Sequence, residues 1–267
     1  MARPPSVIGV LVMAYGGPGR IEDVEPYLLD VRGGHSIPPP VLAQVKRRYQ
    51  LVGGRSPILE RTRAQANALQ AALDSRGAGM RTYVGMRHWH PRLAEAVAGM
   101  AADGVGAMVG LVMAPHYSRL SVEMYYEGLT EAIAAHHPGL QVARIDSWKD
   151  DRGYLGVLRE RTSRALLRFP PELRPRVELV CTAHSLPERI LEWNDPYPGE
   201  LRVTFDALRE AFPGLRAHFA YQSAGMTPEP WLGPEAGALM EERLAAGAGA
   251  FLVVPMGFVS EHVEILY

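Results

Sequence analysis

Cysteine and lysine are almost absent from this sequence. Cys181 is the only cysteine among the 267 residues, which excludes an internal disulfide and any four-thiolate cluster built from this chain alone. It lies in an apolar segment, so we expect an unreactive buried thiol. Only Lys46 and Lys149 among the 28 basic residues are lysine. Genomic composition accounts for most of the arginines, although a guanidinium also suits ligands with carboxylates because it can bind both oxygens.

The sequence also lacks a strong net charge and a long apolar run. The net charge of -1 gives no indication of a nucleic-acid or anionic-membrane surface. The longest apolar run near the N-terminus, Val7–Ala14, is too short to span a membrane and lacks the charged start and cleavage pattern of a signal peptide. With 47% hydrophobic and 21% charged residues, the composition is that of a soluble globular protein, which we expect in the cytoplasm.

Short apolar runs alternate with amphipathic stretches along the whole chain. This rhythm predicts an α/β fold with parallel sheets covered by helices. The predicted strands are 7–14, 81–85, 105–114, 140–146, 177–183, 215–221 and 250–255, and the clearest predicted helices are 92–102, 122–136 and 152–169. Segment 33–57 interrupts the rhythm with glycine and proline pairs around one short helix. It is long for a connection, which indicates a binding insertion.

A weak internal similarity divides the chain in two. Val10–Pro18 resembles Leu179–Pro187, and Gly104–Pro115 resembles Gly247–Pro255. We therefore expect two similar domains, 1–147 and 148–267, that face one another across a cleft.

His184 has the most informative surroundings in the chain. It follows the predicted strand 177–183, and open α/β sheets bind ligands at the carboxyl ends of their strands. Ser185 and Glu188 have the spacing of a capping box, which predicts a helix that starts at Ser185. The positive end of that helix would favour a neutral imidazole able to accept a proton. The alternative for such a residue taken alone is a histidine that hydrogen-bonds a turn.

Tyr15 and Trp231 are candidate contacts for a flat ligand. Tyr15 follows the first predicted strand, and Gly16 and Gly17 would let such a ligand approach the backbone. This turn does not have the spacing of a dinucleotide motif, so NAD is discounted. Trp231 lies in a loop rich in proline and glycine and offers a large flat face. A turn with a half-buried tyrosine and an ordinary structured loop are the alternatives.

The end of the chain carries candidate metal ligands. Ser260 and Glu261 predict a helix start, and Glu261, His262 and Glu264 would occupy its first turn, where a carboxylate anion is stabilised. Such side chains could handle a divalent ion, and a solvated helix face would explain them as well.

Eight short motifs together resemble the ferrochelatase family. They occur in the family's order and spacing over essentially the whole chain: Tyr15–Pro18, Gly53–Pro57, Ala114–Ser118, Ala183–Pro187, Asp195–Pro198, Tyr221–Ser223, Pro230–Pro234 and Gly257–Glu264. One such motif would carry little weight, whereas eight in order are specific.

The resemblance implies two doubly wound, Rossmann-like parallel-sheet domains that face one another across a porphyrin cleft, with a porphyrin-binding insertion at 33–57. The implied activity is insertion of Fe²⁺, as a substrate, into the porphyrin. His184 and Glu264, both in the domain 148–267, would be the catalytic pair that handles the metal and the protons. The residues implied for porphyrin binding are Tyr15, on the opposite face of the macrocycle, with Arg32, Arg48, Ser56, Tyr125 and Trp231.

Two departures from the family pattern bear on these expectations. Gly33-Gly34-His35 stands where the family continues a basic run after Arg32, which weakens the implied propionate contact. The family continues beyond the position of Tyr267 with an acidic stretch, a strand and a helix, so the domain 148–267 is expected to be incomplete. No cofactor and no iron–sulfur cluster is expected, although some members ligate a cluster with cysteines of that tail.

The substrate implied by the resemblance is coproporphyrin III, which would give coproheme in heme biosynthesis. Tyr15 resembles the coproporphyrin-type members, and four propionates would suit Arg32 and Arg48. The alternatives are a ferrochelatase for protoporphyrin IX and a tetrapyrrole carrier that does not metallate. A cobalt chelatase of the same fold is disfavoured by the Tyr15 turn and the Trp231 loop. We expect a monomer that makes a transient contact with a downstream coproheme decarboxylase and binds neither nucleic acid nor a membrane.

Overall fold

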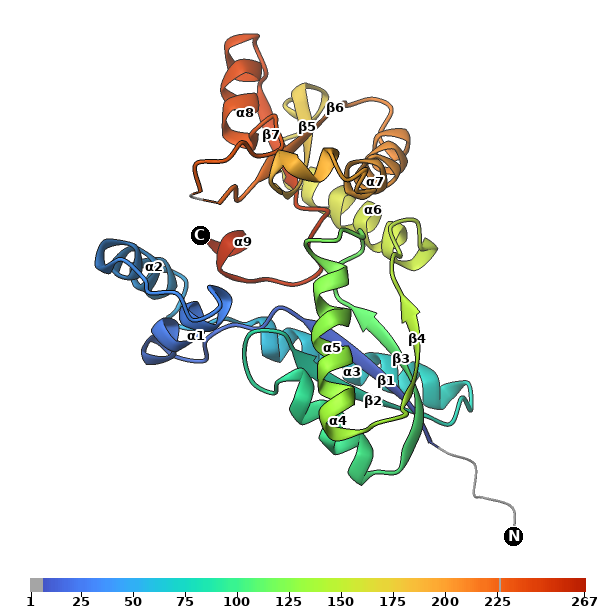
Figure 1. The fold of residues 1–267 in the computed structure, drawn as a ribbon. Coiled ribbons are helices and arrows are strands. Elements are labelled where there is room, and N and C mark those ends of the chain that lie inside the picture. The colour runs from blue at the N-terminus through green and yellow to red at the C-terminus, as the bar shows by residue number, and fades with distance from the viewer. Residues whose placement is uncertain (1–6, 226) are drawn as a thin grey trace. The chain divides into compact units, whose positions relative to one another are not determined.

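The computed structural model describes residues 7–225 and 227–267, which form two compact units (Figure 1). The first unit contains residues 7–113 with 122–146 and 260–267, and the second contains 114–121 with 147–259. Each unit has its own parallel sheet, so the predicted fold class, two doubly wound α/β domains, is confirmed. These units differ from the expected division at residue 147 in two segments. Residues 114–121 belong to the second unit, and residues 260–267 belong to the first.

The sheet of the first unit has four parallel strands in the order β2-β1-β3-β4. Their bounds are Val7–Ala14 for β1, Met80–Met86 for β2, Val105–Val112 for β3 and Gln141–Ile145 for β4. Each lies at a strand predicted from the sequence. Every residue of β1 from Gly9 onward is buried, because a central parallel strand is covered on both faces.

Helices connect these strands by crossovers in two directions. Helix α3 (Ile58–Ser75) leads from β1 to β2, whereas α4 (Leu93–Ala102) and α5 (Val122–His136) lead back toward β3 and β4. Right-handed crossovers in opposite directions place α3 on one face and the other two helices on the other. Consistently, α4 and α5 pack against one another, in front of the sheet as seen in Figure 1.

Two further helices lie between β1 and α3. Helix α1 (Val24–Val31) follows a short 3-10 turn at Ile21–Asp23, and α2 (Pro39–Leu51) occupies the segment 33–57. The predicted short helix of that segment therefore has 13 residues and starts on two prolines, which suit the first helical turn.

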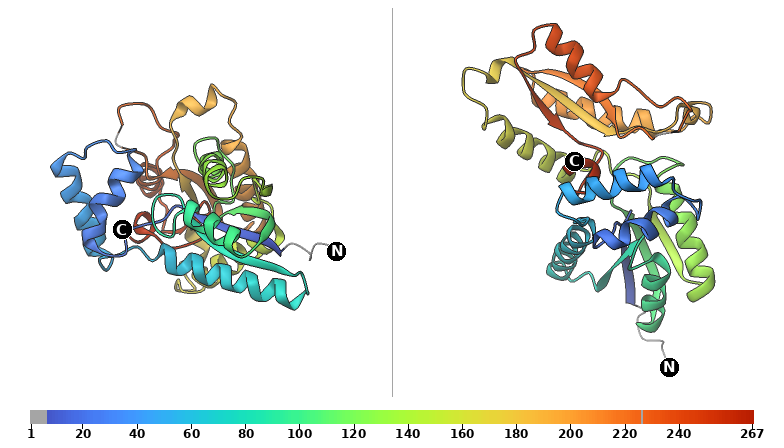
Figure 2. Two further views of the ribbon diagram at one scale, coloured as in Figure 1. Left: turned by 60° about the horizontal axis from the view of Figure 1, so that its bottom comes forward. Right: turned by 90° about the vertical axis from the view of Figure 1, so that its left-hand side faces the viewer.

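The second unit has three parallel strands in the order β6-β5-β7. Strand β5 (Val177–His184) lies between β6 (Arg216–Gln222) and β7 (Ala250–Val254). The helices are α6 (Arg152–Leu166), α7 (Tyr197–Ala211) and α8 (Ala236–Ala245), with 3-10 turns at Arg174–Arg176 and Glu188–Leu191. The views of Figures 1 and 2 show α7 and α8 on opposite sides of this sheet.

Successive side chains of β5 point to opposite faces of the sheet and therefore pack against different helices. Cys181 packs in one core cluster with Phe205 of α7, whereas Val180 packs in another with Ala236 of α8. The predicted burial of Cys181 is confirmed, and burial raises the pKa of its thiol to about 12. The thiol is therefore protonated at neutral pH and inert.

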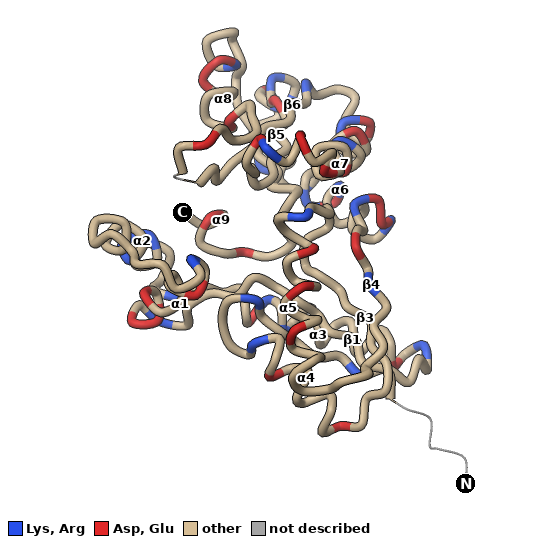
Figure 3. The backbone as a smooth tube through the Cα atoms, viewed as in Figure 1, with Lys and Arg blue, Asp and Glu red and all other residues tan. Residues whose placement is uncertain are grey.

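Charges of both signs are interspersed over each unit, with no extended region of one sign in the view of Figure 3. Among the helices of residues 7–225 and 227–267, none is long and apolar enough to cross a membrane.

Candidate active site

Tyr15 lies at the carboxyl end of β1, where a parallel sheet presents its binding edge. The ladder between β1 and β2 continues past both strands: Arg87 N–H donates to Ala14 O and His88 N–H donates to Tyr15 O, each at 2.9 Å. This register places the rings of Tyr15 and His88 together, with centroids 4.6 Å apart and planes tilted by 53°. The Tyr15 residue remains 38% exposed.

The two glycines after Tyr15 are required by the protein's own packing. Gly16 has φ of +90°, and a Cβ there would lie 2.9 Å from the backbone nitrogen of Trp89. A Cβ on Gly17 would lie 2.6 Å from the side chain of Ser56. The atoms that approach these glycines closely are thus protein atoms, where the sequence suggested a flat ligand.

Ser56 is joined to this turn by a hydrogen bond from its backbone N–H to Pro18 O at 2.8 Å. A pocket of about 520 Å³ opens beside it, between the start of α3 and the loop after β2. Gly17, Ser56, Arg63 and Trp89 are among its lining residues. One of the residues predicted to contact the porphyrin edge therefore lies at a concave surface.

A charged clamp lies beside Tyr15, formed by Asp30 of α1 with His88 and Arg92. The Asp30 carboxylate accepts from His88 Nδ1 at 2.9 Å and from Arg92 Nη1 at 2.7 Å. Burial opposes ionisation of Asp30, but the hydrogen bonds from Arg92 and His88 outweigh it and lower its pKa. Burial lowers the pKa of His88 and, with the charge of Arg87, outweighs the hydrogen bond to Asp30, which raises it, so a neutral ring is favoured at pH 7.

Four phenols interact electrostatically with one another: Tyr15, Tyr27, Tyr49 and Tyr125. Burial is the main reason why the pKa of each is raised, and the negative charge of Glu264 adds to the effect on Tyr15, Tyr27 and Tyr49. Arg87 opposes the shift at Tyr15, and its guanidinium lies 5.6 Å from the ring centre of Tyr125. The phenols are therefore neutral at physiological pH.

Glu264 lies close enough to the phenols to affect them because the segment 260–267 packs in the first unit. Arg61 of α3 makes an ion pair with Glu261 at 2.6 Å, and the guanidinium of Arg48 lies 5.2 Å from the ring centre of Tyr267. The helix in this segment, α9, spans only Val263–Leu266 and has His262 at its N-cap. The predicted start at Ser260–Glu261 is wrong, since Glu261 is held by Arg61 ahead of the helix. Glu264 does lie in the first turn, as predicted.

Two arginines predicted to contact the porphyrin differ in their surroundings. Arg48, in the last turn of α2, has a buried Nε that finds no hydrogen-bond partner among the residues that the structure describes. Arg32, at the C-cap of α1, is exposed. A buried donor without an acceptor is costly, so the Arg48 side chain is held less favourably than one whose donors are all paired.

In the second unit, His184 is the last residue of β5 and is half-buried, so its predicted place at a strand's carboxyl end is confirmed. Its Nδ1 makes a short hydrogen bond with Ser185 O. A carbonyl oxygen can only accept, so Nδ1 carries the proton of the neutral ring and Nε2 carries the lone pair. Nε2 is therefore the atom of His184 that can take up a proton or contact a metal ion.

The predicted capping box after His184 is wrong. The helix there is a single 3-10 turn, Glu188–Leu191, with Pro187 at its N-cap. Ser185 does not cap it, because its hydroxyl donates to Leu232 O at 2.8 Å. A turn of four residues starting at Glu188 cannot supply the helix dipole expected at His184. Backbone and hydroxyl groups hold the residues around His184 instead, and the ring of Phe258 lies 6.4 Å from the ring of His184.

Residues 184–188, here called the His184 loop, are held by their neighbours. Ser185 N–H donates to Gln222 O at 2.7 Å, and the hydroxyl of Tyr197 donates to His184 O at 2.9 Å. A β-bridge joins Pro187 to Trp231, whose indole N–H donates to Thr227 at 3.1 Å. The loop predicted to carry Trp231 therefore supports the His184 loop directly.

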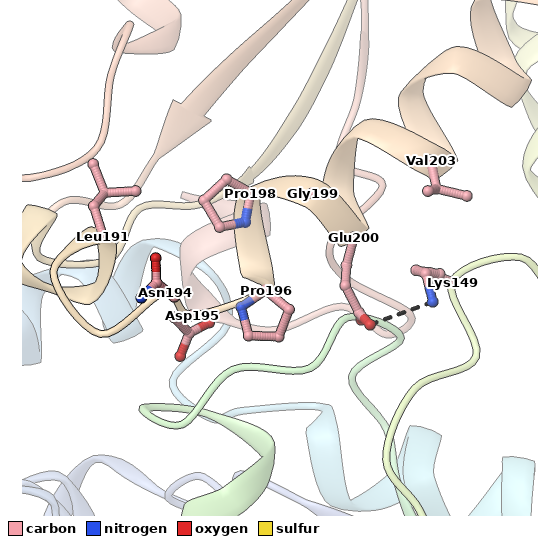
Figure 4. A pocket seen from close by; sticks show the side chains of 9 residues that line it. All are labelled: Lys149, Leu191, Asn194, Asp195, Pro196, Pro198, Gly199, Glu200 and Val203. Carbon is pink, nitrogen blue, oxygen red and sulfur yellow. Dashed lines mark ion pairs between the residues drawn. The ribbon is translucent and has the colours of Figure 1, made fainter.

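A surface pocket of about 560 Å³ lies on the second unit but does not include His184 (Figure 4). Lys149 and Glu200 form an ion pair at its rim, 3.3 Å apart, and Leu191 and Val203 contribute apolar surface. Glu200 also accepts from Ser147 at 2.7 Å. This carboxylate is thus engaged in joining α7 to the segment before α6.

The described residues contain no group of three or more His, Cys, Asp and Glu side chains that could hold a metal ion. Tyr15, Arg32, Arg48, Ser56, Tyr125 and Glu264 lie in the first unit, and His184 and Trp231 lie in the second. Sequence reasoning missed Tyr27, Tyr49 and the Asp30 clamp. A usable signal existed for His88, because it follows strand 81–85 at the same kind of strand end as Tyr15 and His184.

Comparison with known proteins assigns this arrangement to a family. The family model described as Ferrochelatase matches residues 7–267. The ferrochelatase of Herpetosiphon aurantiacus is 39% identical over 259 residues, which cover 97% of this chain and 85% of that protein. The coproporphyrin III ferrochelatase of Geobacillus kaustophilus is 40% identical over 267 residues, with 97% and 83% covered. The ferrochelatase of Deinococcus radiodurans is 38% identical over 262 residues, again covering 97% and 83%. The chain therefore belongs to the ferrochelatase family of enzymes, which insert a metal ion into a porphyrin.

Proposed function

We propose that this enzyme inserts Fe²⁺ into coproporphyrin III and releases coproheme. The observation that carries this proposal is the half-buried Arg48 in the insertion predicted to bind the porphyrin. A guanidinium can bind both oxygens of a propionate, and coproporphyrin III carries four propionates where protoporphyrin IX carries two. Relatives named coproporphyrin III ferrochelatases, such as that of Geobacillus kaustophilus, support the choice of substrate.

The reaction makes three demands on the protein. A free porphyrin carries two inner N–H protons, both of which leave when the metal enters. Its four nitrogens lie in a plane and cannot all meet a metal above the ring, so the macrocycle has to bend. The energy for bending comes from binding the rest of the substrate, including its propionates.

His184 is the proposed proton acceptor and metal contact. Its Nδ1–H is committed to Ser185 O, so the lone pair of Nε2 is the basic group. A neutral imidazole is an effective base near pH 7. Held by its loop, the ring cannot exchange its two nitrogens without breaking that hydrogen bond.

Glu264 is the proposed oxygen ligand for the incoming cation, and Tyr15 is the proposed contact on the opposite face of the macrocycle. A carboxylate suits a hydrated divalent ion and can pass metal inward or protons outward. A single carboxylate binds iron less completely than a closed set of four ligands would, so the metal can move on to the porphyrin. A phenol oxygen can ligate iron once it is inserted.

Metal insertion with two porphyrins tests the proposal. Zn²⁺ is the convenient probe because it has no redox chemistry and its product is coloured. We expect a higher kcat/KM with coproporphyrin III than with protoporphyrin IX, since discrimination between substrates is measured by this ratio. Arg48→Ala should reduce the ratio of kcat/KM for coproporphyrin III to that for protoporphyrin IX. Arg47→Ala changes the exposed neighbour on α2 and should leave this ratio unchanged.

Each other outcome assigns a different function. A preference for protoporphyrin IX would replace the proposed substrate. Binding of either porphyrin without metallation would identify a tetrapyrrole carrier.

A further inference from the structure

His88 lies against Tyr15 through the backbone and the side chain together. The hydrogen bond from His88 N–H to Tyr15 O fixes the two residues side by side, and their ring centroids are 4.6 Å apart. Tyr15 as a residue is 38% exposed, so a ligand can reach part of it. The imidazole covers another part.

The imidazole is itself held from two directions. Asp30 accepts from Nδ1 of His88 through one oxygen at 2.9 Å and from Arg92 through the other at 2.7 Å. The His88 side chain is only 12% exposed. A ring whose hydrogen bond and packing are both satisfied does not change rotamer freely. The clamp therefore offers Tyr15 a rigid surface.

We infer that His88, held by Asp30 and Arg92, is a positioning residue that fixes the orientation of the Tyr15 phenol toward the bound macrocycle. The inference rests on the proposed function, in which Tyr15 contacts the porphyrin. Fixing the phenol before the ligand binds avoids the ordering cost that a freely rotating side chain would add. The same carboxylate joins α1 to the start of α4, so the support for Tyr15 is tied to the helix that has Arg32 at its C-cap.

Two variants separate the effect of the His88 ring from the effect of its hydrogen bond to Asp30. His88→Ala removes both the ring and the hydrogen bond to Asp30. His88→Asn removes the ring but retains an amide that can donate to Asp30. His136→Ala is the control, because this exposed histidine is the last residue of α5. Its neighbour His137 bonds Val105 O at the opposite end of the sheet from Tyr15.

The first measurement is the NMR signal of the Tyr15 ring in the ligand-free protein, with ¹³C in all tyrosine rings. This signal is assigned by its loss in Tyr15→Phe. We expect the signal to shift in both His88 variants and to stay in place in His136→Ala. We also expect His88→Asn to melt within a few degrees of the wild type, since the clamp's hydrogen bond is retained. An unmoved Tyr15 signal in either His88 variant would overturn the inference, whatever the activity of the enzyme.

The second measurement is the visible spectrum after iron(III) coproporphyrin is added directly to each protein, so that no turnover is needed. Tyr15→Phe should shift the bound band by removing the phenol oxygen, and His88→Ala should shift it in the same direction. In the double variant the shift should not exceed that of Tyr15→Phe alone, because His88 acts through Tyr15. Additive shifts, or an unshifted band in His88→Ala, would overturn the inference. Failure of the proposed function would be seen separately, as a wild-type protein that metallates neither porphyrin.

Discussion

The carboxyl ends of β1 and β5 occupy equivalent places in their sheets but hold their candidate residues by different means. After β1, Tyr15 is surrounded by side chains: the imidazole of His88, the charge of Arg87 and the phenol of Tyr125. After β5, the ring of His184 hydrogen-bonds the backbone oxygen of Ser185 and lies 6.4 Å from the ring of Phe258, and the carbonyl of His184 accepts from the Tyr197 hydroxyl.

The difference predicts how each end responds to change. Side-chain contacts around Tyr15 depend on the size and charge of each neighbour, so single substitutions should affect this end strongly. Main-chain hydrogen bonds survive most substitutions, so the His184 loop should tolerate changes in its neighbours. A fixed ring suits a base that must present one nitrogen, whereas a phenol packed among other side chains suits a surface against which a large ring is bound.

The largest expected effect is that of His184→Ala, which removes the proposed base from the β5 end. Metal insertion should fall by at least about 100-fold, within the range of general-base contributions. Porphyrin affinity, measured by quenching of tryptophan fluorescence, should persist because the residues proposed to bind the propionates are unchanged. Insertion at the wild-type rate would remove His184 from the mechanism and leave the β5 end without a proposed role.

Glu264→Gln should give the next largest effect on turnover. The amide nearly preserves the shape of the side chain but removes the anionic oxygen, so insertion should slow by about tenfold or more. Glu261→Gln is the matched variant three residues earlier. It should slow insertion much less, since the Glu261 carboxylate is engaged by Arg61 at 2.6 Å. Loss of porphyrin affinity in Glu264→Gln, without loss of turnover, would make Glu264 a structural residue of the first unit.

Sequence patterns predicted the strands and the strand ends well because these depend on local periodicity. The alternation and apolar runs identified β1 and β5, and the rule for open sheets then selected Tyr15 and His184. The fold class followed from the same rhythm.

What the sequence could not supply were partners distant in the chain. Ser185 had the spacing of a helix cap, but its hydroxyl bonds Leu232 O, 47 residues away. His88 and Asp30 are separated by 58 residues, and no local pattern connects them. Tertiary hydrogen bonds of this kind override local capping preferences, because a buried carbonyl needs a donor more than an exposed helix end does.

Acid should destabilise the second unit through His116, a buried histidine to which no catalytic or binding role is assigned here. Its Nε2 lies 2.8 Å from the hydroxyl of Thr204, and burial lowers its pKa from 6.5 to about 3. The folded state thus prefers the neutral ring. The contribution to stability is complete above pH 6.5 and is lost as the pH falls from 6.5 toward 3, because the unfolded chain takes up the proton first.

The variant His116→Asn should therefore show a smaller loss of unfolding free energy between pH 7 and pH 4 than the wild type does. Urea unfolding at each pH measures the difference, and only the change with pH is compared, since the substitution also costs stability at pH 7. Parallel curves for the two proteins would show that His116 titrates alike in the folded and unfolded states.

The smallest expected effect comes from Tyr197→Phe, which tests the tolerance of the His184 loop directly. Tyr197 is buried, and its hydroxyl donates to His184 O at 2.9 Å. Losing this hydrogen bond should cost about 1 kcal/mol of unfolding free energy. The bonds from His184 Nδ1 to Ser185 O and from Ser185 N to Gln222 O remain, so the ring should keep its orientation. Insertion should then slow by less than about threefold, since the base itself is intact. Tyr221→Phe, at another buried tyrosine of the same core, is the matched control for removing a hydroxyl without touching the His184 carbonyl. A loss of insertion as large as that of His184→Ala would mean that one side chain holds the β5 end. The two strand ends would then be built alike, and the contrast between backbone and side-chain support would fail.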